Sequence, residues 1–90
     1  MELTFNKVGN KYISEFEVTS DFNIHIERPE GGITNIYQRT FPEGEYAVVD
    51  GFDTNGKSVI DIDFTALVYP KWIKVVCGNK PSVGVVTIAE

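Results

Sequence analysis

The stretch FNIHIER, residues 22–28, decides the fold class of this chain. Its apolar residues, Phe22, Ile24 and Ile26, alternate strictly with polar ones. Because successive side chains of a β-strand point to opposite faces of the sheet, this period of two predicts a strand with one face in a core and one in water. The proline and glycines that follow, in PEGG, predict a turn, since proline lacks a backbone donor and glycine adopts positive φ.

The same alternation recurs along the rest of the chain, whereas helical periodicity is nearly absent. Turn residues interrupt it at short intervals, and Asn55-Gly56 is the strongest hairpin signal among them. The predicted strands cover residues 2–8, 12–18, 22–28, 33–40, 45–52, 58–64, 71–77 and 83–88.

Short strands with frequent turns predict an all-β fold: a single antiparallel β-sandwich, jelly-roll-like, of about eight strands. A small closed barrel is the alternative. The 90 residues have room for one core, so we expect a single domain, residues 1–90. The one cysteine, Cys77, excludes an intrachain disulfide and a zinc cluster built on cysteines.

The net charge of −5 argues against two classes of partner. Nucleic-acid binding requires a basic surface, and an anionic membrane repels an acidic domain, so we expect neither partner. No apolar run is long enough to span a membrane. The start, MELTFNKVGN, lacks the pattern of a secretory signal, which predicts a cytoplasmic or virion-associated protein, secreted only if a signal was removed.

His25 is the only histidine and shares the polar face of its strand with Asn23 and Glu27. A catalytic histidine needs a nucleophile, an orienting carboxylate or a metal, and one histidine with one carboxylate is too few ligands for tight zinc binding. We therefore interpret His25 as a solvent-facing residue and expect His25→Ala to leave stability and binding nearly unchanged. Cys77 ends an apolar strand face and is expected to be buried as a small hydrophobic residue.

Acidic residues form the one cluster that suggests a cation. Asp50, Asp53, Asp61 and Asp63 lie within one predicted hairpin, and calcium binds clustered carboxylates in loops. The EF-hand pattern is missing, however, and Asp61 and Asp63 alternate with apolar residues. We interpret the cluster as a hydrated strand face and a turn, with calcium as the alternative; no catalytic residue, metal site or cofactor is predicted.

Trp72 is the most informative aromatic residue. If Ile73 and Val75 face the core, Trp72 and Val76 face outward, and an exposed tryptophan suggests a contact surface or a platform for stacking sugars. The alternative is that Trp72 packs beneath residues 65–70 as part of the core.

The last predicted strand, 83–88, is apolar on both faces, which would make an exposed edge prone to aggregation. We therefore expect it to be central or covered by another copy of the chain. Strand 33–40 likewise does not favour one face, and together the two strands predict subunit contacts, with a central strand in an asymmetric sandwich as the alternative. The interface candidates are Trp72, Val76, Val83, Val85, Val86, Ile88, Ile36 and Tyr37.

Phosphate-loop, nucleophile, metal and dinucleotide motifs are absent from the sequence, so we do not expect an enzyme. We expect a non-enzymatic structural or assembly protein that forms a homo-oligomer, a trimer or dimer, within a larger particle. The alternative is a module that binds carbohydrate or another small ligand through exposed aromatic residues.

Several stretches resemble one group of proteins. The eight-strand plan, the Asn55-Gly56 hairpin, the segment DIDF (61–64) leading to YPKWIKV (69–75), and the absence of a leader resemble small β-sandwich proteins of phage and prophage virions. The resemblance covers most of the chain. It implies an oligomer with a structural role in the head or tail, and it supplies no functional residues.

Overall fold

The computed structural model describes residues 1–49, 58–65 and 68–89, and within these ranges the chain is all-β with no helix. None of the described residues therefore belongs to a helix long and apolar enough to cross a membrane. The strands are β1 (Asn6–Val8), β2 (Lys11–Val18), β3 (Phe22–Glu27), β4 (Thr34–Arg39), β5 (Ala47–Val48), β6 (Val59–Phe64), β7 (Lys71–Cys77) and β8 (Val83–Ile88).

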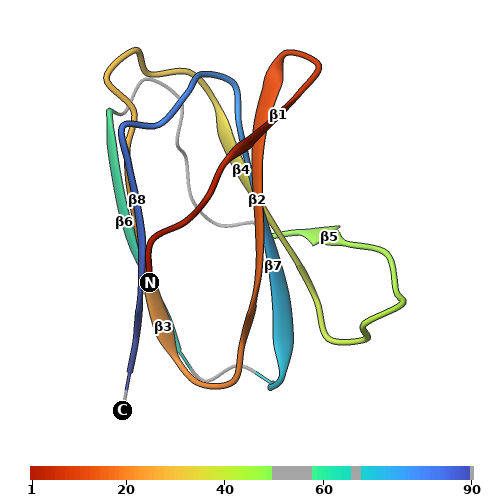
Figure 1. The fold of residues 1–90 in the computed structure, drawn as a ribbon. Helices are drawn as coiled ribbons and strands as arrows, with labels where there is room; N and C mark the ends of the chain where they lie inside the picture. Colours follow the sequence, from red (N-terminus) through yellow and green to blue (C-terminus); the bar gives the residue numbers. More distant parts are fainter. Residues whose placement is uncertain (50–57, 66–67, 90) are drawn as a thin grey trace.

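The strands form two antiparallel sheets, which Figure 1 shows as two layers. One sheet has five strands in the order β1-β2-β7-β4-β5, and the other has three in the order β6-β3-β8. The decisive strand β3 is the centre of the smaller sheet, where Ile24 lies between Ile62 on β6 and Val86 on β8. The expected strand-rich fold is thus confirmed.

Side chains from both sheets form one apolar core. The alternation of residues 22–28 is confirmed, because Phe22, Ile24 and Ile26 are all buried. The rings of Phe22 and Phe64 stack with centroids 4.9 Å apart, and Cys77 is fully buried as expected. The core consists of Val18, Phe22, Ile24, Ile26, Ile36, Ile60, Phe64, Ile73, Val75, Cys77 and Val86.

The predicted strand 2–8 is wrong as one continuous element, because it is divided between the two sheets. Only Asn6–Val8 pairs with β2, whereas residues 1–3 lie against β8. The backbone N–H of Leu3 donates to the carbonyl of Gly84 at 2.8 Å, and that of Val86 donates to the carbonyl of Met1 at 2.8 Å. Residues 1–5, called the N-terminal arm below, thus cross from one layer to the other (Figure 1).

The arm corrects the expectation for strand 83–88. This strand, β8, is at the edge of its sheet rather than in the centre, and residues 1–3 of the same chain pair with part of that edge, at residues 84–86. Leu3 and Phe5 of the arm also pack against the core. Gly84 leaves room for them, since a Cβ at Gly84 would lie 2.7 Å from Cε2 of Phe5.

The predicted strand 45–52 is also shorter than expected. Only Ala47–Val48 pairs with β4, and residues 50–52 lie outside the described ranges, as does the Asn55-Gly56 turn. Residues 40–46 form a turn that projects away from the two layers at the right of Figure 1. The other strands begin and end within one or two residues of their predicted bounds.

Candidate functional site

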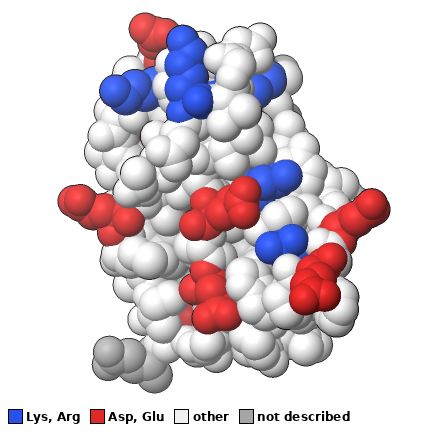
Figure 2. Space-filling model, turned by 45° about the vertical axis from the view of Figure 1, so that its right-hand side comes forward, with Lys and Arg blue, Asp and Glu red and all other residues white. Residues whose placement is uncertain are grey.

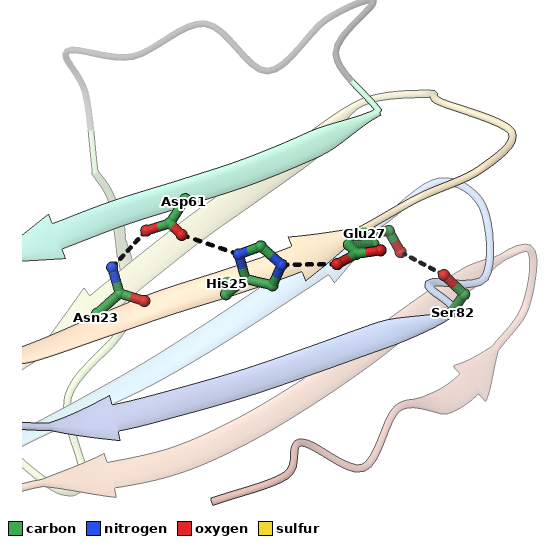
Figure 3. Close-up of polar contacts among 5 residues, drawn as sticks. All are labelled: Asn23, His25, Glu27, Asp61 and Ser82. Carbon is green, nitrogen blue, oxygen red and sulfur yellow. Dashed lines mark hydrogen bonds and ion pairs between the residues drawn. The ribbon is translucent and has the colours of Figure 1, made fainter.

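The outer face of the three-stranded sheet carries a polar cluster around His25 (Figure 3). Alternation places Asn23, His25 and Glu27 on this face, and the β3–β6 register places His25 opposite Asp61. Nδ1 of His25 lies 2.9 Å from a carboxylate oxygen of Asp61, and Nε2 lies 2.8 Å from one of Glu27. The Asn23 amide donates to Asp61 and, at 2.9 Å, to Asp63.

These contacts favour the charged forms of the cluster. The hydrogen bond with Glu27, followed by that with Asp61, raises the pKa of His25 above its ordinary value of 6.5. The hydrogen bonds from Asn23 and His25 lower the pKa of Asp61. In its protonated form, His25 donates to two carboxylates, one on its own strand β3 and one on the adjacent strand β6.

The cluster does not form a nucleophilic site in the described part of the chain. Both ring nitrogens of His25 face carboxylates, while the Cys77 thiol is buried in the core, where burial raises its pKa. Among the described residues, no group of three or more His, Cys, Asp or Glu side chains is placed to hold a metal ion. Asp50 and Asp53 lie outside the described ranges, so the four predicted acidic residues are not described as one group.

The projecting turn between β4 and β5 is the second candidate site, called the 40–46 hairpin below. Phe41 is 62% exposed within it, and Val48 of the following strand β5 is 49% exposed. The turn is held by its own backbone, because the Gly44 N–H donates to the Phe41 carbonyl at 2.9 Å. Arg39 of β4 also donates from Nη1 to the Gly44 carbonyl at 3.0 Å. The exposed ring thus sits on an ordered support.

Aromatic and cationic side chains fix the base of the hairpin to the outer face of the five-stranded sheet. The Arg39 guanidinium lies 4.4 Å from the centroid of the Tyr46 ring. The Lys74 ammonium lies 5.0 Å from the ring of Tyr37 and 4.8 Å from that of Tyr46. The Tyr46 hydroxyl donates to Glu15 at 3.3 Å. These contacts connect the hairpin to β2, β4 and β7.

Trp72 lies on the same outer face and is half-buried. Its register partners are Glu17 on β2 and Arg39 on β4. The alternative prediction is that Trp72 packs beneath residues 65–70. Residues 66–67 of that segment lie outside the described ranges, so this packing stays a prediction.

The structure corrects two interface candidates. Ile36 and Val86 are fully buried in the core of their own chain and are not accessible to a partner. The remaining candidates lie at the surface of two different sheets rather than in one patch: Trp72, Val76 and Tyr37 on one, and Val83, Val85 and Ile88 on the other.

Sequence reasoning did not identify Phe41 and Val48 as exposed apolar residues. It placed the segment FPEG, residues 41–44, in a turn and took no account of the aromatic ring there. The available signal was a large apolar residue within a turn, where burial is not expected.

A groove lies beside the N-terminal arm, where β2 extends beyond its pairing with the short β1. Its volume is about 430 Å³. The arm forms one wall, and residues of β1 and β2 form the other. Apolar side chains contribute much of the lining: Met1, Leu3, Val8, Ile13 and Phe16.

Comparisons with known proteins gave no match. No protein-family model matches the chain, and no curated protein or solved structure shows significant similarity to it. The virion resemblance and the finer type of fold therefore stay proposals.

Proposed function

We propose that this protein is a non-enzymatic structural protein that assembles into a homo-oligomer, a dimer or trimer, within a larger particle of the phage or prophage virion type. The single observation that carries the proposal is the ordered 40–46 hairpin with its exposed Phe41. The protein would act in the cytoplasm or on the virion, and its charge of −5 argues against nucleic acid or membrane as the partner.

The energetics of interfaces support a contact role for this hairpin. Most binding energy at a protein interface comes from a few side chains, and aromatic anchors are prominent among them. Burying an exposed phenylalanine contributes about 1.5–3 kcal/mol. Because the Arg39–Gly44 hydrogen bond already orders the backbone of the turn, the entropy lost on binding would come mainly from the Phe41 side chain.

The finer fold that we propose is a β-sandwich of the jelly-roll type, and the order of the strands supports it. The chain passes from β2 in one sheet to β3 in the other and back to β4, and it changes sheets again between β5 and β6, β6 and β7, and β7 and β8. The arm then pairs with β8, so the first and last parts of the chain meet. Jelly rolls occur in viral capsid and lectin domains, which fits both functional readings.

Sedimentation velocity over a concentration series tests the assembly role. We expect the wild-type protein to self-associate and Phe41→Ser to shift the midpoint of association to a concentration about tenfold higher or more, as 1.4 kcal/mol corresponds to a factor of ten. Ile33→Ser is the matched control, since Ile33 is 55% exposed but lies outside the hairpin. A wild-type protein that stays monomeric at every concentration would contradict the proposal.

Carbohydrate binding is the second candidate, favoured by Trp72, Tyr37 and Tyr46 on one sheet face. Lys74 already occupies space beside both tyrosine rings, which leaves Trp72 as the principal stacking platform. Calorimetric titration with polysaccharides tests this function. Binding that is lost in Trp72→Ala but kept in Phe41→Ser would favour it over assembly.

A further inference from the structure

We propose that a pocket at the base of the 40–46 hairpin binds a small organic acid, whose carboxylate is held by Lys71 and Arg39. The inference stands apart from the assembly role, because it concerns a ligand of the single chain. It starts from a lysine that is buried beside this pocket without a counterion among the described residues.

The pocket, called the hairpin pocket below, has a volume of about 290 Å³. Its lining includes two cations, Arg39 and Lys71, one carboxylate, Glu45, and the aromatic ring of Phe41. Arg39 pairs with Trp72, the residue after Lys71, so the two cations lie at the same end of the neighbouring strands β4 and β7. Both cations therefore border one cavity.

Lys71 is the residue on which the inference depends. It begins β7 on the same face as Ile73 and Val75, and it is only 5% exposed. Within residues 1–49, 58–65 and 68–89, its ammonium makes no hydrogen bond or ion pair. Because a buried charge is costly unless it is paired, an anion in the hairpin pocket would stabilise this side chain.

Arg39 has donors left for the same anion. Its Nη1 donates to the Gly44 carbonyl at 3.0 Å, and its guanidinium lies over the Tyr46 ring. Its Nε is buried and has no hydrogen-bond partner among the described residues. Since a guanidinium carries five N–H donors and binds carboxylates well, Arg39 can hold the hairpin and a carboxylate together.

The charge balance of the hairpin pocket favours an anion with one negative charge. Glu45 is exposed and, in the described part of the chain, forms no ion pair with Lys71 or Arg39. Two cations and one carboxylate leave a single positive charge, which a monocarboxylate neutralises. Inorganic phosphate carries more than one negative charge at neutral pH and would exceed this balance.

The apolar part of the lining favours an acid with an apolar body. Phe41 and Ala47 both line the hairpin pocket and are exposed, so a ring placed against them would remove apolar surface from water. A cavity of about 150 Å³ is enough to hold benzene. The volume of about 290 Å³ therefore leaves room for a ring of this size and its carboxylate.

The surface around the hairpin offers an anion little attraction of its own. Figure 2, in which the hairpin side of the molecule is turned forward, shows small basic areas beside acidic side chains on this face. The larger group of basic side chains lies at the upper end. Binding of an acid at the hairpin therefore depends on the cations that line the pocket.

Titration with sodium benzoate at constant ionic strength, followed in amide NMR spectra, tests the inference. We expect saturable shifts in residues 38–41, 44–47 and 71, with a Kd of about 1 mM. Benzamide, which has the same shape without the charge, should bind about tenfold more weakly or worse. Inorganic phosphate should also bind more weakly than benzoate, because its charge exceeds that of the pocket.

Two lysine variants locate the binding charge. Lys71→Met keeps the length of the side chain and removes its charge, so it should lower the affinity for benzoate about tenfold or more. Lys80→Met is the matched control, since Lys80 is exposed and lies outside the hairpin pocket, and it should leave the affinity unchanged. Circular dichroism melts verify that both variants fold.

Four results would overturn the inference. They are the absence of saturable shifts with benzoate, equal binding of benzamide, undiminished binding in folded Lys71→Met, and tighter binding of phosphate than of benzoate.

Glu45→Gln is a second route if Lys71→Met does not fold. Glu45 is exposed, so this variant should fold, and it removes the one carboxylate that opposes the ligand. We expect the affinity for benzoate to rise about two- to fivefold. An unchanged or lower affinity in this variant also overturns the inference.

Discussion

The contact between Gly84 and Phe5 gives a prediction whose sign can be calculated from the structure. Gly84 lies on edge strand β8 with an ordinary strand backbone, so alanine is allowed there by conformation. A Cβ at this position would, however, lie 2.7 Å from Cε2 of Phe5 and 3.4 Å from Cβ of Leu3. The distance to Phe5 is far below van der Waals contact, whereas the distance to Leu3 is a close but allowed contact.

Two opposing effects set the magnitude. Glycine in a strand costs about 0.5–1 kcal/mol relative to alanine, so the backbone term favours Gly84→Ala. Overpacking against the Phe5 ring costs about 1–3 kcal/mol. We expect Gly84→Ala to destabilise the wild-type protein by up to about 2.5 kcal/mol, and to stabilise the Phe5→Ala protein by about 0.5–1 kcal/mol, since the steric term is then removed.

Urea denaturation of the four proteins in this double-mutant cycle, followed by circular dichroism, measures the free energies of unfolding. Gly78→Ala is the matched control, because a Cβ there would have its nearest neighbour at 3.6 Å. Equal effects of Gly84→Ala in both backgrounds, within about 0.5 kcal/mol, would refute the packing of the arm against β8.

Three further predictions concern titratable groups. The contacts of His25 with Glu27 and Asp61 replace the earlier expectation that substituting His25 leaves stability nearly unchanged. Because they raise the pKa of His25, these contacts stabilise the fold fully below about pH 6.5 and lose this effect as the pH rises through the folded-state value. The melting temperature of wild type should therefore exceed that of His25→Gln at pH 5.5, and a gap of the same size at pH 9 would contradict this. Desolvation, followed by the hydrogen bond to the Asp21 carboxylate, raises the pKa of Tyr69 to about 12. In an ultraviolet titration, Tyr69→Phe should therefore remove the last tyrosine ionisation step, and loss of an earlier step instead would disprove this assignment. Cys77 is fully buried with a raised pKa, so a thiol reagent should label it only in denaturant, and rapid labelling of the native protein would speak against the burial.

The alternation of side chains predicted which face of strands 22–28 and 71–77 enters the core, because a period of two fixes the inward face wherever only one face is apolar. It did not do so for strands 33–40 and 83–88, where Ile36 and Val86 are buried in the core. Phe22, Ile24 and Ile26 follow the rule, and so does Cys77 at the end of β7. The same rule placed His25 on the polar face correctly. It could not show that Asp61 lies opposite, since pairing register depends on the partner strand and not on the pattern within one strand.

The arm and the hairpin show a second limit of sequence reasoning. In residues 2–8, Leu3 and Phe5 have the spacing of one apolar strand face. The backbone nevertheless changes sheets within this stretch: Glu2 pairs with β8 of one sheet, and β1, from Asn6 onward, pairs with β2 of the other. In the 40–46 hairpin, Tyr46 contacts Glu15 of β2 and Lys74 of β7 and so fixes the base of a turn that has no periodic pattern. Both features depend on residues distant in sequence, which local propensity does not encode.

The edges of the two sheets bear on how copies could join. An open edge strand can pair with another chain, and proteins protect such edges by shortening, charging or covering them. Here β1 has three residues and β5 has two, β8 is covered by the arm, and β6 presents Asp61 and Asp63 on its exposed face. Continuing a sheet from one copy into the next is therefore disfavoured at each of these strands. The proposed assembly would therefore depend on side chains that project beyond the sheets, and among the described residues Phe41 combines high exposure with an ordered support.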